Sequence, residues 1–203
     1  MGRTSDARQR LLDAALALIW ERSYSGTSVD AICERAGVKK GSFYHFFSSK
    51  ADLAAAAIEA SHERRCAFMD DCFSPSVPPL ERLRRYLGAA YEEQARLCRE
   101  TGRVLGCPLF TLGAEICHED ERLRQVINGI LDQHLAYFEN AVRDAAAAGI
   151  VEAADPAARA RGLFSMLEGA LTQARIRNDP AFLKHLPDEA LASLGADVAA
   201  AEG

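Results

Sequence analysis

The sequence gives almost no sign of β-strands. No stretch of its 203 residues alternates apolar and polar side chains over the length of a strand, and no Asn-Gly or Asp-Gly pair joins two strand-like runs. The apolar residues, 49% of the chain, are dominated by alanine and leucine, which both favour helices. We therefore predict an all-α fold with a sizeable core.

Long apolar runs are also absent. None approaches the roughly 18 residues that a membrane-spanning helix needs. The segment Met1–Asp6 has no apolar stretch behind a basic start, and Asp6 stands where a myristoylation pattern would have Ser or Thr. We expect a cytoplasmic protein without a membrane partner.

The chain lacks the motifs of the common enzyme classes. It contains no Gly-x-Ser-x-Gly, Gly-x-x-x-x-Gly-Lys, His-Glu-x-x-His or Gly-x-Gly-x-x-Gly pattern. Its six cysteines include no Cys-x-x-Cys pair, so we expect reduced thiols. Cys107 and Cys117 match no closed zinc spacing, and the nearby Glu119 and Asp120 suit the positive end of a helix. We expect no enzymatic activity, no metal and no other cofactor.

Positive charge is scarce overall, because the formal net charge is −5. Its distribution is uneven. Residues 1–65 carry ten Lys and Arg against eight Asp and Glu, a balance of +2, whereas residues 66–203 have a balance of −7. This asymmetry fits a two-part molecule in which only the N-terminal part faces nucleic acid.

Helical periodicity runs through most of the chain. We predict helices over about residues 5–23, 28–35, 39–46, 50–72, 80–99, 119–148 and 156–177, and a last helical region that ends near residue 194. Ser49 and Asp155 are suited to cap helices, and Gly149 to end one. Glycine and proline interrupt residues 101–118, which we predict to be less regular.

Residues 27–50 carry the most informative pattern. Ser28 is suited to cap the first of two short helices, and Gly37 supplies the left-handed residue that a sharp turn between helices needs. The second helix opens with Lys39-Lys40-Gly41-Ser42, which offers two cations, a glycine that allows close approach, and a hydroxyl. A helix with such an N-terminus can enter the major groove of DNA.

The same segment resembles the signature of the TetR/AcrR family of transcriptional regulators. Lys40-Gly41-Ser42-Phe43-Tyr44 is similar to the family's recognition helix, and Phe47, Lys50 and Leu53 follow at the expected intervals. The resemblance implies a three-helix helix-turn-helix DNA-binding domain, here residues 1–50, followed by a helical ligand-binding and dimerisation domain, residues 51–203. It implies a sequence-specific repressor that a small-molecule inducer releases from its operator.

The resemblance also implies a DNA-binding face. Lys40, Gly41 and Ser42 would meet base edges or nearby phosphates, and Tyr44 and Lys50 would each contact a phosphate. The full set expected at DNA is Thr27, Ser28, Lys39, Lys40, Gly41, Ser42, Tyr44, His45 and Lys50. The expected partner is double-stranded DNA with a palindromic operator, because a homodimer reads two half-sites.

Two positions depart from the family pattern. Ser23 replaces a usual glycine, so we expect a different turn after the first helix, and Phe46 replaces a usual polar DNA contact. A Gly-Val turn also joins helices in bundles that bind no DNA. Burial of Lys40, Ser42 and Tyr44 would favour that alternative, a helical ligand-binding module without DNA.

Small residues recur along the predicted helix 156–177. Gly162, Ser165 and Gly169 would let a partner helix approach closely, with Met166 among them. An intrachain core helix is the alternative reading, but an operator of two half-sites calls for a two-fold symmetric reader. We predict a dimer interface at Gly162, Ser165, Met166 and Gly169.

The stretch Gly106–Glu115 resembles a Gly-Cys-x-x-x-x-Leu-x-x-Glu pattern of one branch of the family. In some members of that branch the cysteine senses electrophiles or oxidants. A thiol near a helix N-terminus can have a lowered pKa and react, whereas a buried cysteine usually packs as a small apolar residue. Cys107 is the candidate redox residue, and thiol-based sensing is the alternative mode of control.

Aromatic and polar residues on otherwise apolar helices are the candidates for an inducer pocket. They are Tyr86, Phe110, His134, Tyr137, Phe138 and Phe164. Aromatic residues at helical spacing more often belong to a core, so the alternative is that these residues pack in the core and line no pocket.

Overall fold

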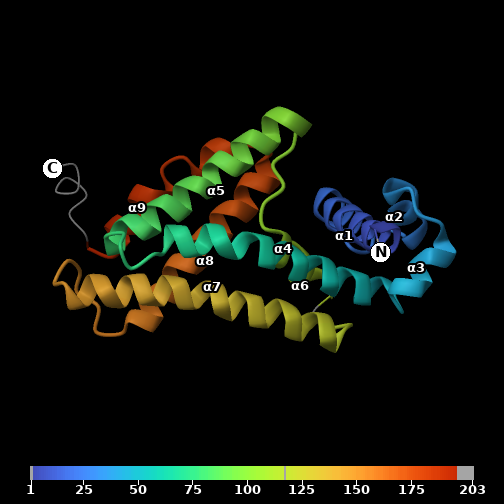
Figure 1. The fold of residues 1–203 in the computed structure, drawn as a ribbon. Coiled ribbons are helices and arrows are strands. Elements are labelled where there is room, and N and C mark those ends of the chain that lie inside the picture. Colours follow the sequence, from blue (N-terminus) through green and yellow to red (C-terminus); the bar gives the residue numbers. More distant parts are fainter. Residues whose placement is uncertain (1, 117, 196–203) are drawn as a thin grey trace. The chain divides into compact units, whose positions relative to one another are not determined.

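The computed structural model describes residues 2–116 and 118–195, with the backbone alone for residues 2–5. Over these ranges it contains nine α-helices, one short 3-10 helix and no strand (Figure 1). No helix in the described part of the chain is long and apolar enough to cross a membrane. The predicted all-α fold is confirmed.

The helices follow the predicted order. They are α1 (Gly2–Glu21), α2 (Val29–Ala36), α3 (Lys40–Phe46), α4 (Lys50–Cys72), α5 (Pro79–Thr101), α6 (Pro108–Ile116), α7 (Glu121–Ala147), α8 (Pro156–Arg177), η1 (Pro180–Leu183) and α9 (Leu186–Ser193). Ser49 and Asp155 each accept a hydrogen bond from the backbone N–H three residues on, as a capping side chain does. Gly149 has a φ of +69°, the left-handed value expected after a helix.

Helix α6 is the element that the sequence pattern did not predict. Pro108 is its first residue, where the missing N–H costs no hydrogen bond. Gly113 lies inside the helix, and a Cβ at this position would stand 3.4 Å from the side chain of Ile127. The glycine that suggested a break therefore permits close packing between α6 and α7.

The chain divides into two compact units. Unit 1 contains α1, α2, α3 and α6 with the first parts of α4 and α7, and unit 2 contains the remaining helices. The chain passes between the units at residues 65–66, 107–108 and 131–132. The predicted division at residue 50 into a DNA-binding and a ligand-binding domain stays a prediction.

Unit 1 has its own apolar core. Helices α1, α2 and α3 pack on one another, and α6 packs on α1 (Figure 1). Ile32, Phe43, Phe47 and Leu53 are buried there, and the half-buried Val38 packs against them. This core fixes which face of α3 points outward. In unit 2, α5 and α8 both pack against η1 and α9.

Candidate nucleic-acid interface

The turn between α2 and α3 has the geometry of a helix-turn-helix. Ser28 accepts a hydrogen bond from the N–H of Ala31 and caps α2. Gly37 then takes φ +62° and ψ +37°, and the N–H of Val38 donates to the carbonyl of Cys33 at 2.9 Å. These bonds satisfy the end of α2 and turn the chain sharply into α3.

The first turns of α3 present the predicted DNA-binding residues to solvent. Lys39, Lys40, Gly41, Ser42, Tyr44 and His45 are all exposed. Tyr44 is 58% exposed, although the adjacent Phe43 is fully buried. Burial of Lys40, Ser42 and Tyr44 would have favoured the alternative of a module without DNA, and the structure does not bury them.

Gly41 is not required by packing within the chain. A Cβ at this position would meet no other atom within 4 Å, and the residue has ordinary helical geometry. An exposed helical glycine lowers stability relative to alanine, so packing alone gives no reason for it. A bare backbone at the start of α3 does allow close approach to a base edge or phosphate.

Lys40 forms an exposed ion pair across the turn. Its Nζ lies 2.8 Å from a carboxylate oxygen of Asp30, and this hydrogen bond raises the pKa of Lys40. Both side chains are more than half exposed, so water and salt screen the pair. A DNA phosphate can therefore replace Asp30 as the partner of the ammonium group.

Thr27 is a correction to the predicted DNA-binding set. The residue is fully buried, and its Oγ1 donates a hydrogen bond of 2.7 Å to the carbonyl of Ser23. Ser23 itself avoids a left-handed φ, and its Oγ accepts from the N–H of Gly26, so the turn after α1 is built from side-chain hydrogen bonds. Thr27 closes that turn, and its buried side chain presents no surface for the expected DNA contact. Ser28, next to it, is exposed.

Lys50, which was expected at a phosphate, makes its contacts within unit 1 in this structure. Its Nζ donates to the carbonyls of Tyr24 and Thr27 at 2.9 and 3.0 Å and lies 3.9 Å from the centre of the Tyr24 ring. Burial lowers the pKa of Lys50. The ammonium group thus holds the α1–α2 loop to the start of α4.

The comparisons with known proteins agree with this geometry. Residues 11–57 match the family model of bacterial regulatory proteins of the tetR family, and residues 79–188 match that of the tetracycline repressor-like C-terminal domain. The transcriptional regulator AcuR of Cereibacter sphaeroides is 36% identical over 178 residues, which is 86% of this chain and 80% of AcuR. The chain belongs to the TetR family.

Further relatives support the assignment of this TetR-family chain. The transcriptional repressor NemR of Escherichia coli K12 is 26% identical over 84% of the chain and 85% of its own length. The crystal structure of a regulatory protein TetR from Rhodobacter sphaeroides has a TM-score of 0.81 with 34% identity, covering 91% of this chain and 96% of that one. The protein is thus a DNA-binding transcriptional regulator with a helix-turn-helix, in a family of regulators and not of enzymes.

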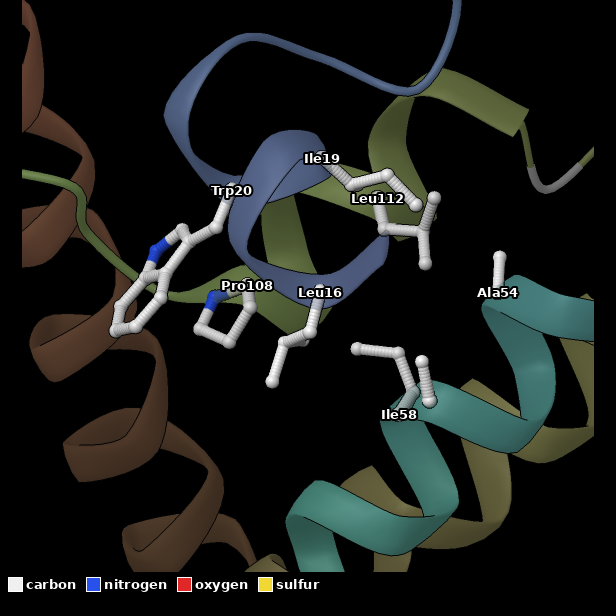
Figure 2. Close-up of a pocket in the computed structure, with 8 residues that line it drawn as sticks. Leu16, Ile19, Trp20, Ala54, Ile58, Pro108 and Leu112 are labelled. Carbon is white, nitrogen blue, oxygen red and sulfur yellow. The ribbon is translucent and has the colours of Figure 1, made fainter. Parts of the chain in front are cut away.

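A small cavity in unit 1 of this TetR-family regulator is too small for an inducer. Figure 2 shows its apolar lining, which comes from α1, α4 and α6. The lining residues are Leu16, Ile19, Trp20, Ala54, Ala57, Ile58, Pro108 and Leu112. Its volume of about 10 Å³ is at the lower limit for one water molecule, so it is a packing void. None of the predicted pocket residues lines it.

Five of the six predicted pocket residues belong to one aromatic cluster in unit 2. The ring centre of Phe138 lies 5.6 Å from that of Phe73 and 5.5 Å from those of Tyr86 and Phe164. Tyr137 packs on Phe73 and His134 on Phe164. The hydroxyl of Tyr137 also donates to Asp70, and this bond is the main reason that the pKa of Tyr137 is raised to about 12.

Phe110 belongs to the other unit. It lies on α6 in unit 1 and is 37% exposed. Sequence reasoning also missed Phe73, which follows α4 and contacts three of the predicted rings. The structure therefore shows one aromatic group that contains five of the six candidates.

Cys107 is half-buried at the end of a loop that unit 2 holds firmly. The side-chain oxygen of Gln94 accepts from the N–H groups of Leu105 and Gly106, and Arg175 donates to the carbonyl of Leu105 at 2.7 Å. Arg175 also packs against Gly106, so a guanidinium lies nearer to this segment than the sequence indicates. Cys117, the other cysteine considered for a metal, lies outside the described residues.

The small residues of α8 lie on its outer face. Gly162, Ser165 and Gly169 are exposed and Met166 is half-buried, whereas Leu163, Phe164 and Leu167 on the opposite face are buried. An added Cβ at Gly162 or Gly169 would meet no atom within 4 Å. The chain itself therefore does not fill the space beside these glycines.

Proposed function

We propose that this regulator is a homodimeric repressor that binds a palindromic operator through α3 and leaves it when a small molecule binds to unit 2. The observation that supports DNA binding most directly is the exposed start of α3, with Lys39, Lys40, Gly41 and Ser42 together. NemR, a relative of similar length, is named a repressor. The family match of residues 79–188 and the aromatic cluster support effector binding in unit 2.

On the DNA, we propose that Lys40 and Ser42 read base edges. Ser28, Lys39, Tyr44 and His45 then contact the sugar-phosphate backbone, which fixes the register of α3 without reading sequence. We leave Thr27 and Lys50 out of the proposed DNA-binding set, because both make their contacts within unit 1. Lys39 takes over the phosphate contact that the sequence had suggested for Lys50.

Salt dependence tests this division. Lys39→Gln should weaken binding on every duplex by a similar factor and reduce the slope of log K against log salt by about one, because one phosphate contact is lost. Lys50→Gln should leave that slope unchanged, because its ammonium group is held inside unit 1. The measurement is fluorescence anisotropy at several salt concentrations, on an operator selected from random duplexes. A slope reduced by Lys50→Gln and untouched by Lys39→Gln would reverse the assignment.

Control through Cys107 is the second candidate, because the guanidinium of Arg175 donates to the carbonyl of Leu105, two residues before Cys107, and a cation near a thiol promotes thiolate formation. We expect the inducer model to hold. Under hypochlorite or a quinone, Cys107→Ser and the wild type should then show the same fraction of bound operator. Mobility shifts with and without oxidant measure this. A wild type that releases DNA while Cys107→Ser stays bound would establish thiol sensing instead.

A further inference from the structure

Glu115, near the end of α6, makes a two-pronged contact in unit 1 that DNA reading does not explain. Its two carboxylate oxygens accept hydrogen bonds from the backbone N–H groups of Tyr24 and Ser25, each at 2.7 Å. Burial alone would raise the pKa of Glu115, but the bonds from Ser25 and Tyr24 and the charge of Lys50 together lower it. The carboxylate is therefore ionised at neutral pH and holds this backbone as an anion.

The backbone that Glu115 holds is the loop that leads into the helix-turn-helix. Lys50 binds the carbonyls of the same loop at Tyr24 and Thr27, so the loop lies between a carboxylate on its N–H side and an ammonium group on its carbonyl side. Thr27 directly precedes Ser28, the cap of α2. The position of the first helix of the motif thus depends on a residue of α6, more than eighty residues further along the chain.

A second carboxylate holds the other end of the motif. Asp52 accepts hydrogen bonds from the backbone N–H and the hydroxyl of Ser48, in the turn that follows α3, at 3.0 and 3.2 Å. Arg122, in the first turn of α7, donates to the same carboxylate. The backbone bond from Ser48 is the main reason that the pKa of Asp52 is lowered. The segment that contains α6 and the start of α7 is therefore bonded to both sides of the helix-turn-helix.

We propose that Glu115 is a positioning residue for operator recognition: it holds the α1–α2 loop so that α2 and α3 keep the orientation that base reading needs. This inference rests on the proposed function, because it assigns Glu115 a part in the binding of an operator. Glu115 acts through the loop backbone and touches no DNA itself.

The electrostatic and the positioning roles of Glu115 predict opposite changes in DNA affinity when its carboxylate is removed. Removing a negative charge from a DNA-binding unit should raise DNA affinity slightly, since phosphates are then repelled less. Loss of the clamp should lower affinity for the operator, where base contacts require a fixed geometry, and should spare non-specific affinity, which is electrostatic. The ratio of specific to non-specific affinity therefore separates the two effects.

The test compares Glu115→Gln with Glu119→Gln. A glutamine keeps the size of the side chain, but its amide cannot accept both N–H groups. Glu119 is an exposed acid that acts on Tyr24 and Lys50 through its charge, so its replacement removes the same charge and leaves the clamp intact. We expect Glu115→Gln to lose operator affinity about tenfold with non-specific affinity unchanged or higher. Glu119→Gln should keep the wild-type ratio.

Hydrogen exchange at the amides of Tyr24 and Ser25 reports the clamp without DNA. We expect faster exchange at these two amides in Glu115→Gln only. Wild-type exchange together with a wild-type affinity ratio would overturn the inference. A wild type that shows no operator preference would instead refute the proposed function, whatever the amides do. If Glu115→Gln does not fold, Glu115→Asp replaces it: the charge stays, the reach is one methylene shorter, and the same loss of ratio is expected.

Discussion

Replacement of Gly169 by glutamate is expected to convert the regulator from dimers to monomers and to lower its operator affinity about a hundredfold or more. In a dimer whose α8 helices meet, the new carboxylate would be buried without a partner, which costs several kcal/mol. A monomer reads one half-site at a time and loses the effective concentration that a second linked half-site provides, on the order of 10² to 10⁴. Sedimentation velocity and operator titration measure the two effects.

The structure supplies a matched control for this experiment. Gly129 on α7 is also an exposed helical glycine, and an added Cβ there also meets no atom within 4 Å. Gly129→Glu therefore adds the same charge at an equally open helical position outside the proposed interface. It should remain dimeric and bind the operator. If Gly169→Glu stays dimeric, or if both variants become monomers, the interface does not lie at Gly162, Ser165, Met166 and Gly169.

The helix-turn-helix could be predicted in detail because its determinants are local. Ser28 caps α2 and Gly37 turns the chain through hydrogen bonds to residues a few positions away. The outward face of α3 follows from the burial of Phe43 in the core of unit 1. Exposure of Lys40, Ser42 and Tyr44 was therefore implied by the sequence pattern and is found in the structure.

The roles of Thr27 and Lys50 could not be predicted because they depend on the loop between α1 and α2. Ser23 changes that loop, and Glu115 fixes it from a helix far along the chain. The motif places Lys50 at the start of a helix, but it does not indicate that the carbonyls of Tyr24 and Thr27 accept hydrogen bonds from its ammonium group. The Gly-Cys pattern did include Glu115, but only tertiary structure shows what the carboxylate binds.

The same limit applies to α6 and to the pocket candidates. Gly113 breaks a helical pattern in sequence, yet it is the residue that lets α6 approach Ile127. Phe110 and Phe138 look alike as isolated aromatics on apolar segments, but they belong to different units. Which aromatic residues contact one another is a property of the tertiary fold that helical periodicity does not contain.

Truncation of Phe138, in the aromatic cluster of unit 2, is expected to have the second large effect, a loss of stability. Phe138 is fully buried, and its ring contacts those of Phe73, Tyr86 and Phe164, which come from three other parts of the chain. If Phe138 is a core residue, truncation of its side chain leaves a cavity that the neighbouring rings cannot fill. Phe138→Ala should then lower the free energy of unfolding by about 3–5 kcal/mol.

Phe68 provides the control within the same cluster. Its ring lies 6.3 Å from that of Tyr86, but the residue is 38% exposed, so Phe68→Ala should cost only about 1 kcal/mol. Urea unfolding at one fixed protein concentration compares the variants, because dimerisation makes stability depend on concentration. A cost for Phe138→Ala no larger than that for Phe68→Ala would show that the protein tolerates an empty space beside Tyr86 and Phe164. Phe138 would then be part of an effector pocket wall. The full cost would instead place Phe138 in the core, and the search for inducer contacts would move to Tyr137 and His134 at the other positions of the cluster.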